Sequence, residues 1–333
     1  MTVGITYDLA EEYRALGYDE EQTAELDHPE TVEAIEGTLR SLGFRTERIG
    51  NIMNLVQRIV RGETWDIVFN IAEGIYGLGR ESQVPALLDA VQVPYTFSGP
   101  AVHALTLHKA MTKHVLRDCG IPTAPFAIAR HTGDLETIQL PFPLFLKPVA
   151  EGTGKGISPA SLVEDRRSLV ENGTALLNRY GQPVLVERYL PGREFTVGLL
   201  GTGDRTEVLP VMEVVFLEGA ESSAYTYYNK KHYRSTVRYR LVGDQEAESC
   251  RSVALKAWQE LGCRDGGRVD LRMDEQGESN IMEINTLPGL HPVDSDLPIM
   301  CGLAGIDYGT LIGKIMDSAL ERFGGRRGFR RTA

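Results

Sequence analysis

Apolar residues follow two alternating spacings along the first hundred positions of the chain. Short apolar runs, which are typical of buried strands, occur at Val3–Thr6, Trp65–Ile71 and Val93–Phe97. Helical spacing occurs within Pro29–Leu42, which Gly43 ends, and a further helix is expected around Pro85–Ala90. Strands that alternate with helices predict a parallel sheet with crossover helices, and therefore an α/β fold.

The rest of the chain mixes longer helical patterns with strands of an antiparallel kind. Helices are predicted at His103–Cys119, Ser161–Tyr180, Asp244–Leu261 and Tyr308–Phe323. Strands are predicted at Pro141–Pro148, Pro183–Leu190, Glu194–Leu200, Glu207–Phe216 and Val237–Arg240. The runs Gly267–Met273 and Asn280–Asn285 flank a turn and predict a β-hairpin.

This hairpin carries the strongest chemical signal. Because side chains alternate along a strand, Arg268 and Asp270 share one face, and so do Glu283 and Asn285. A register that joins these faces would gather ligands that Mg²⁺ prefers, beside a guanidinium that can neutralise developing negative charge. The apolar residues expected on the opposite face are Val269, Leu271, Met282 and Ile284. The alternative is a half-exposed polar sheet face without a ligand.

Two weaker signals precede the hairpin. Lys147 ends a predicted strand and is followed by glycines at 152, 154 and 156, whose small size lets backbone N–H groups approach phosphate oxygens. Glu187–Leu190 ends another strand, where an extended backbone can bind an adenine edge and Glu194 can bind ribose hydroxyls. Each signal alone is also compatible with an ordinary turn.

Charge and composition narrow the function classes. The net charge of −11 argues against a nucleic-acid partner, and no apolar run approaches the ~20 residues that span a bilayer. With no signal-peptide pattern at the start, we expect a cytoplasmic protein without membrane contact. The four cysteines lack C-x-x-C spacing and are expected to be reduced. The basic tail Arg326–Arg331 is expected to be solvated.

Residues 8–36 contain eleven Asp or Glu and a single base, Arg14. The stretch Glu11–Asp27 is expected to be a long acidic loop or a short helix. Charge runs of this kind are usually solvated faces.

Taken in order, the motifs resemble the D-alanine–D-alanine ligase family of ATP-grasp enzymes. The resemblance runs from about Trp65 to Phe323 and includes Phe145-Leu-Lys147-Pro, Glu187-Arg-Tyr-Leu, and Glu283-Ile-Asn285-Thr-Leu-Pro-Gly289. It implies an ATP-grasp fold with three domains: an N-terminal open parallel sheet (1–102) and two nucleotide-clasping α+β domains (103–190 and 191–333). It also implies a homodimer, small amino-acid or peptide substrates, ATP, and two Mg²⁺ ions that Mn²⁺ can replace.

The resemblance further implies roles for individual residues. Phosphate-binding residues would be Lys109, Lys147 and, within Tyr225–Lys230, Lys230, with Gly152, Thr153 and Gly154 in the covering loop. Adenosine-binding residues would be Glu187, Tyr189, Leu190 and Glu194. Metal ligands would be Asp270, Glu283 and Asn285, with Arg268 and the backbone of Gly289 forming an oxyanion hole.

The sequence departs from the family where substrates are recognised. The glutamate that reads the first amino group is missing from its usual motif, and Asp8, Glu11 and Glu12 are candidate substitutes. The usual His-Gly is Glu73-Gly74, and the serine that links the substrate loops is replaced within Thr153-Gly154-Lys155. Lys231 stands where the family has tyrosine.

Near the second-substrate site the chain has Asp294 and Asp296. Two carboxylates would repel an anionic amino acid by about 4 kcal/mol per pair at 4 Å and an effective dielectric of ~20. This suggests an acceptor other than free D-alanine, unless Asp294 simply caps a helix that begins near Leu297.

We therefore expect an ATP-dependent carboxylate–amine ligase with altered substrate residues that acts through an acyl phosphate. The alternatives are a true D-alanine–D-alanine ligase of peptidoglycan synthesis and a non-catalytic ATP-binding module. Lys147 and the hairpin residues Arg268, Asp270, Glu283 and Asn285 favour turnover over binding alone.

Overall fold

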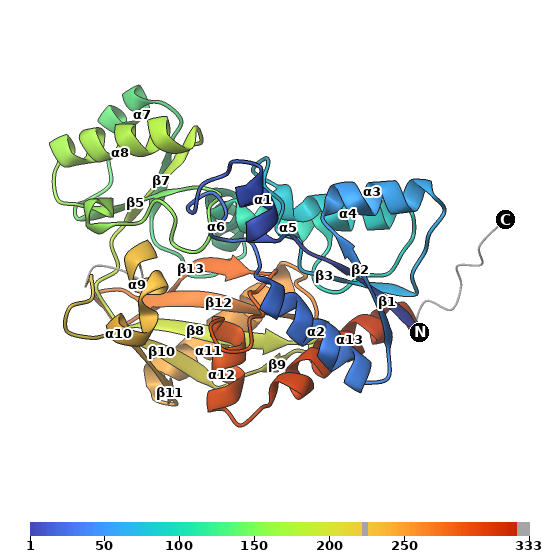
Figure 1. Cartoon of the computed structure of the whole chain (residues 1–333). Helices are drawn as coiled ribbons and strands as arrows, with labels where there is room; N and C mark the ends of the chain where they lie inside the picture. Colours follow the sequence, from blue (N-terminus) through green and yellow to red (C-terminus); the bar gives the residue numbers. More distant parts are fainter. Residues whose placement is uncertain (222–225, 325–333) are drawn as a thin grey trace.

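The computed structural model describes residues 1–221 and 226–324, and its strands form three separate sheets (Figure 1). The predicted basic tail and Tyr225 lie outside the described residues. The first sheet is parallel, in the order β2 (Arg45–Gly50), β1 (Thr2–Thr6) and β3 (Ile67–Asn70). Its helices are α1 (Ala10–Ala15), α2 (Pro29–Ser41), α3 (Ile52–Val60) and α4 (Gln83–Ala90).

The second sheet is antiparallel and small. Its order is β4 (Phe126–Ala129), β7 (Val184–Arg188), β5 (Leu144–Pro148) and β6 (Leu162–Val163). The helices α7 (Thr132–Thr137) and α8 (Arg166–Tyr180) pack on it through Leu135, Leu169 and their neighbours. Helices α5 (Pro100–Leu107) and α6 (Lys109–Asp118) connect the first sheet to the second.

The third sheet contains the predicted hairpin. Its order is β11 (Val237–Val242), β10 (Val211–Phe216), β8 (Glu194–Leu200), β12 (Gly266–Met273) and β13 (Ser279–Asn285), and β9 (Glu207–Val208) pairs with β8. The helices of this part are α9 (Tyr227–Lys231), α10 (Tyr233–Thr236), α11 (Gln245–Glu260), α12 (Asp296–Leu303) and α13 (Tyr308–Gly324). The predicted α/β fold is confirmed, with one parallel sheet followed by two antiparallel sheets.

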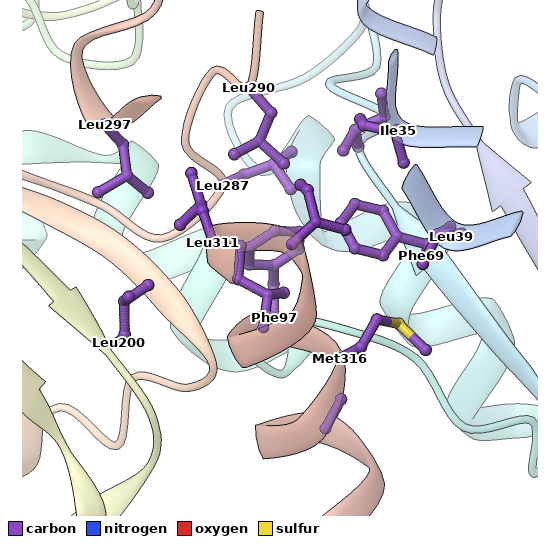
Figure 2. Close-up of a cluster of buried hydrophobic side chains, with 14 of the residues drawn as sticks. Ile35, Leu39, Phe69, Phe97, Leu200, Leu287, Leu290, Leu297, Leu311 and Met316 are labelled. Carbon is purple, nitrogen blue, oxygen red and sulfur yellow. The ribbon is translucent and has the colours of Figure 1, made fainter. Parts of the chain in front are cut away.

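One apolar core joins the first sheet to the C-terminal part. Figure 2 shows Phe69 and Phe97 among leucines from both ends of the chain, and the two rings meet edge to face at 5.7 Å. Leu39 of α2 and Met316 of α13 belong to the same cluster. A second core packs the buried Trp258 of α11 against β8, β12 and β13. The hairpin is therefore fixed from its apolar side.

Several predicted elements differ from the structure. The predicted helix His103–Cys119 is two helices, because the backbone turns at His108 and the N–H of Lys109 donates to Val149 O at 2.8 Å. Val93–Phe97 is not a strand and contributes only a bridge between Val68 and Tyr95. Helix α8 begins at Arg166 rather than Ser161, and the predicted strand Glu207–Phe216 is interrupted between β9 and β10.

Met282 lies on the opposite face from the one we predicted. The register pairs Asp270 with Glu283 but Leu271 with Ile281, so Met282 is an extra residue on β13. Such a bulge shifts the alternation of side chains. Met282 and Glu283 therefore both line a cavity on the polar side of the hairpin. Val269, Leu271 and Ile284 are buried in the core, as predicted.

Across the described ranges, no single helix is long and apolar enough to cross a membrane. The bent pair α12 and α13, which meet at 114°, reaches the required length and composition only when the two are taken together. The four cysteines are unpaired, as expected.

Gly267 offers a test of the hairpin's packing. A Cβ atom there would lie 2.4 Å from Asn285 O and 2.5 Å from the Trp258 ring. We expect Gly267→Ala to lower the free energy of unfolding by about 1–3 kcal/mol, because backbone and core must both shift. Urea denaturation measures this change.

The control for that variant is Gly302→Ala in α12, where an added Cβ meets nothing within 4 Å. This variant should leave the protein unchanged or stabilise it by about 0.5–1 kcal/mol. Equal stability of the two variants would contradict the packing argument.

Candidate active site between the second and third sheets

The polar groups of the hairpin converge on Asp270. Arg268 forms an ion pair with it, Asn285 Nδ2 donates to its Oδ2 at 3.1 Å, and Thr196 Oγ1 donates to its Oδ1 at 2.9 Å. Glu283 lies opposite Asp270 in the strand register. The predicted meeting of the two polar faces is confirmed, and its cause is the pairing of β12 with β13.

Three lysines from three elements line one cavity with this hairpin. Lys109 lies at the start of α6, Lys147 on β5 and Lys230 on α9, and all three line the cavity together with Asp270 and Glu283. Lys109 Nζ lies 3.2 Å from Glu283 Oε2 and donates to Glu151 O at 2.6 Å. This first cavity therefore combines ammonium groups with carboxylates, as a site for a metal-bound polyphosphate requires.

Asp270 is buried and the Glu283 side chain is 20% exposed, and the surroundings of the two carboxylates differ. Burial alone would raise the pKa of Glu283, yet the positive charges of Lys109, Lys230 and Arg268 hold it well below the usual range. The pKa of Asp270 is raised, because burial and Glu283 outweigh Arg268. Glu283 is thus the more firmly ionised of the two.

Two glutamates that line the first cavity each have one buried oxygen for which no hydrogen bond of good geometry is found within the described residues. These are Oε2 of Glu187 and Oε2 of Glu194. Lys113 Nζ lies 2.8 Å from Glu187 Oε2, but outside hydrogen-bond geometry, and Arg272 lies 3.5 Å from Glu194 Oε2. Glu187 is thus paired with Lys113, whereas the nearest cation to Glu194 Oε2 is more distant, so Glu194 has the greater capacity to accept a hydrogen bond from a ligand.

Lys113 was not predicted as a site residue, although it lies one helical turn after Lys109. Its ammonium is buried and donates to Thr123 Oγ1 at 2.6 Å. Although burial opposes ionisation, Lys113 and Lys147 lower the pKa of Glu187 to about 2. Lys147 Nζ lies 2.6 Å from Glu187 Oε1. The spacing i, i+4 on one helix face was the available signal.

The predicted adenosine and loop residues lie around the same cavity with two exceptions. The residues that line it are Glu187, Tyr189, Leu190, Glu194 and Gly154. Thr153 lines a second cavity instead, and Gly152 donates its N–H to Glu25 Oε1 at 2.8 Å. Gly154 has φ +72°, and a Cβ there would lie 2.8 Å from Tyr227 N, so the loop lies tightly against α9.

The second cavity has a volume of about 420 Å³ and adjoins the first through Lys230. The residues of interest on its walls are Arg268, Gly289, Asp27, Thr153, Lys231, Asp294 and Asp296. The Arg268 side chain is 14% exposed, and it lies 3.6 Å from Asp296 Oδ2 in addition to its ion pair with Asp270. The predicted oxyanion residues Arg268 and Gly289 are thus brought together on one cavity wall.

Three predicted substrate residues, Asp8, Glu11 and Glu73, line neither cavity. Asp8 is buried and accepts hydrogen bonds from Tyr13 Oη at 2.5 Å and from Gly74 N at 2.9 Å. Each of its two carboxylate oxygens therefore already has a donor within the protein. Glu11 is exposed on α1. Glu73 is half-buried near Arg80, and its pKa is raised by burial and by neighbouring carboxylates.

Asp294 and Asp296, near the predicted second-substrate site, each have hydrogen-bond donors or a cation as partners within the protein. Asp294 accepts from Arg234 at 2.8 Å and from Tyr233 Oη at 2.6 Å, and Asp296 accepts from Tyr239 Oη at 3.1 Å in addition to its contact with Arg268. The expected strong repulsion of an anion therefore does not follow. The helix cap is also corrected, because Ser295 rather than Asp294 precedes α12.

Asp27 is the acid that the sequence analysis missed. It lines the second cavity, is separated from α2 by the N-cap residue His28 and, within the described chain, has no cationic partner. Burial and the charge of Asp8 raise its pKa to about 8, although Thr31 donates a hydrogen bond to it. An acid close to the start of a helix that begins with proline was a usable signal, but the surrounding acidic residues of the segment made it hard to single out.

The donor set of the hairpin fits a hard divalent cation. Asp270, Glu283 and Asn285 offer oxygens, which Mg²⁺ prefers, and the ion usually takes its remaining ligands from phosphates and water. Nowhere in residues 1–221 and 226–324 do three His, Cys, Asp or Glu side chains converge on one metal position. A cation there would therefore depend on the nucleotide for part of its coordination.

Comparison with known proteins gives a consistent family. A family model described as D-ala D-ala ligase C-terminus matches residues 115–317. An uncharacterized protein of Sinorhizobium fredii, y4sG, is 37% identical over 79% of this chain and 77% of its own length. The D-alanine–D-alanine ligase of the same strain is 31% identical over 86% of this chain and 90% of its own length.

Further matches extend over most of the chain. The D-alanine–D-alanine ligase of Alcanivorax borkumensis is 31% identical over 87% of this chain and 88% of its own length. The crystal structure of the D-alanine–D-alanine ligase from Bacillus anthracis complexed with ATP superposes with a TM-score of 0.74 at 21% identity, covering 98% of this chain and 99% of that one. This structural likeness establishes the fold.

Lys113 gives a test of the first cavity. Lys113→Met removes one of the two cations that hold Glu187, so we expect the Kd for ATP to rise about tenfold, or about 1.4 kcal/mol. Isothermal titration calorimetry measures this affinity. Lys256→Met, which removes an exposed lysine bound only to Cys119 O at 3.2 Å, should leave it unchanged. Unaltered ATP affinity in a folded Lys113→Met protein would exclude the role.

Proposed function

The chain belongs to the D-alanine–D-alanine ligase family and is an ADP-forming ATP-grasp ligase, and from this premise we propose that it joins two amino-acid or peptide substrates of which at least one is not D-alanine. The observation that carries the proposal is that the two cavities meet at Lys230, with Arg268 and Gly289 lining one cavity and the carboxylates of Glu187 and Glu194 lining the other. ATP would occupy the first cavity and the substrates the second.

The first cavity has side chains that could bind the adenosine part of ATP and others that could bind its phosphates. The ionised Glu187 would accept a hydrogen bond from the adenine amino group, and Glu194 would accept from a ribose hydroxyl. Lys109, Lys147 and Lys230 would neutralise the phosphates from three directions. Magnesium held by Asp270, Glu283 and Asn285 would add Lewis-acid stabilisation of the phosphate charge.

The proposed reaction has two steps, phosphoryl transfer to a carboxylate and attack of an amine on the acyl phosphate. A substrate carboxylate oxygen attacks the γ-phosphorus, the bond to the β-phosphate oxygen breaks, and ADP leaves. The amine of the second substrate then attacks the acyl carbon, phosphate leaves, and the nitrogen loses a proton. Arg268 and the Gly289 N–H would stabilise the tetrahedral oxyanion, and one such donor is worth roughly 3 kcal/mol.

Three features support substrates that differ from two D-alanines. The chain is more similar to y4sG than to the D-alanine–D-alanine ligase of the same strain. Lys231 and its ion pair with Glu20 at 2.6 Å occupy the rim of the second cavity. Asp27 offers a carboxylate for a substrate ammonium on the opposite wall.

A screen of amino-acid pairs tests the proposal. Purified protein with ATP and Mg²⁺ is given D- and L-amino acids singly and in pairs, and ADP, phosphate and amide products are measured. We expect amide formation to be fastest with a pair other than D-alanine alone. Fastest turnover with D-alanine alone would instead support a true D-alanine–D-alanine ligase.

The control for this screen is Arg268→Met. It should bind ATP like the wild type but lose about 10²–10³ in rate, because an oxyanion donor is removed. Phosphate release that stays at the wild-type rate in this variant would indicate a contaminating ATPase.

Asp27 predicts a pH dependence. Below its pKa of about 8 the carboxyl is protonated and cannot pair with a substrate ammonium, so kcat/KM for the amine-bearing carboxylate substrate should rise as pH increases toward 8. Asp27→Asn should lower kcat/KM and remove this rise. Initial rates between pH 6 and about 9 measure it. An unchanged profile in the variant would exclude Asp27.

A further inference from the structure

The wall of the second cavity that carries Arg268 also carries Asp296. Both side chains are 14% exposed, and Arg268 Nη1 lies 3.6 Å from Asp296 Oδ2. Tyr239 Oη donates to the other carboxylate oxygen of Asp296 at 3.1 Å. Since Arg268 is also paired with Asp270, two carboxylates of the protein share its single positive charge before any substrate binds.

This sharing affects an acceptor whose amine and carboxylate are on the same carbon. The amine has to reach an acyl carbon beside Arg268 and Gly289, so the carboxylate of such an acceptor would enter the same part of the cavity. Asp296 does not repel it strongly, because Asp296 has partners of its own. Arg268, however, has little charge left to attract it, and an ion pair shielded from water is costly to break.

Two other cations of the second cavity have different surroundings. Lys230 also lines the first cavity, and its charge contributes to the low pKa of Glu283, which suits it to the phosphates. Arg14 is exposed on α1, in the first part of the chain. Arg268 is therefore the cation next to the reacting groups, and it is already paired.

A third cavity of about 480 Å³ continues outward from the second, and we call it the outer cavity. It is formed by α9, α10 and Asp294, and Figure 1 shows α9 and α10 beside the third sheet. Arg234 and two lysines line it, against one acid. The second and outer cavities share four lining residues, which are Lys230, Lys231, Tyr233 and Asp294. A ligand in the second cavity can therefore extend into basic surroundings.

The cations of the outer cavity are paired as well, but their pairs are exposed. Arg234 Nη2 lies 2.8 Å from Asp294 Oδ1, and the two side chains are 71% and 45% exposed. Lys231 Nζ lies 2.6 Å from Glu20 Oε1, and these side chains are 47% and 64% exposed. Exposed ion pairs contribute little to stability, so they exchange partners at small cost. A ligand carboxylate can compete for Arg234 and Lys231 far more easily than for Arg268.

The inner and outer guanidinium groups are held by two acids on one short stretch of chain. Asp296 contacts Arg268 and Asp294 contacts Arg234. Two positions of extended chain span at most about 7 Å, so the separation of these sites is roughly the length of a short peptide.

We propose that the acceptor is the N-terminal amine of a short peptide, whose C-terminal carboxylate binds at Lys231 and Arg234. This inference rests on the proposed ligase function and names its second substrate. The amine nitrogen attacks the acyl carbon, the bond from that carbon to the phosphate oxygen breaks, and the nitrogen loses a proton. The group next to the reacting amine is then an uncharged amide, so no anion enters the space beside Asp296.

The test compares four acceptors with the same N-terminal residue: alanine, alaninamide, the alanyl-alanine dipeptide and the C-terminal amide of that dipeptide, in D and L forms. Each is mixed with wild-type protein, ATP, Mg²⁺ and one amino acid at a time as the donor, and the products are identified by mass. We expect kcat/KM for the dipeptide to exceed that for free alanine about tenfold or more. Free alanine that equals or exceeds the dipeptide would overturn the proposal.

Arg234→Gln tests the outer cavity. It should lower kcat/KM for the dipeptide about two- to fivefold and leave the dipeptide amide unchanged, because only the dipeptide has a carboxylate to pair with an exposed cation. The matched control is Arg238→Gln, which removes an exposed arginine of β11 that lines none of the three cavities and should change neither acceptor. Equal effects of Arg234→Gln on the dipeptide and its amide would overturn the assignment.

Asp296→Asn tests the inner wall. It leaves Arg268 with one carboxylate partner, so kcat/KM for free alanine should rise about tenfold relative to that for the dipeptide. Because two acceptors are compared within one variant, a general loss of activity cancels. The matched control is Asp204→Asn, an exposed acid that lines none of the three cavities. An unchanged ratio in folded Asp296→Asn would overturn the role of Asp296.

The same acceptor series separates this inference from the function on which it rests. Amide formation by wild type with none of the four acceptors and no donor would refute the ligase function itself. Amide formation that favours free alanine over the dipeptide would refute only the peptide acceptor.

Discussion

Charge compensation inside the protein is the constraint on which this site depends. Lys109 and Lys147 are buried next to Glu283 and Glu187, and the half-buried Arg268 is paired with Asp270. An unpaired buried ion costs several kcal/mol, so cations intended for an anionic ligand must have partners before the ligand arrives. The cavity can therefore stay folded and highly charged at once. When ATP binds, its phosphates share cations that the fold has already oriented.

The apolar side of the hairpin makes this arrangement possible. Trp258 and the small residue Gly267 let α11 approach β12 closely, which fixes the strand that carries Arg268 and Asp270. The core that joins α2 with α13 fixes the first sheet against the same C-terminal part. Because both walls of the second cavity rest on these cores, Asp27 and Arg268 face one space although they are far apart in the sequence.

The sequence was informative where a signal is local. Alternation along two strands was sufficient to predict the pairing of the Arg268–Asp270 face with Glu283 and Asn285, and helical spacing predicted α2 and α11. The prediction failed where an extra residue in a strand shifts the alternation of side chains between the two faces, as at the bulge that contains Met282. It also failed for Glu25 and Lys113, whose surroundings are made by distant segments. A charge run in a sequence does not reveal which of its members is buried, and Glu25 and Glu11 look alike until the chain is folded.

The acidic segment before α2 contacts the glycine-rich loop and also lines the second cavity. Glu25 and Asp27 are two positions apart, and one faces the glycine-rich loop while the other lines the substrate cavity. The backbone at Asp27 is tied to the end of β1, since Asp27 N donates to Asp8 O and Ala10 N donates to Asp27 O, each at 3.0 Å. These two hydrogen bonds fix the backbone of Asp27 beside the start of α1, so the carboxylate that lines the second cavity is positioned by the first part of the chain, whereas Arg268 is positioned by the third sheet.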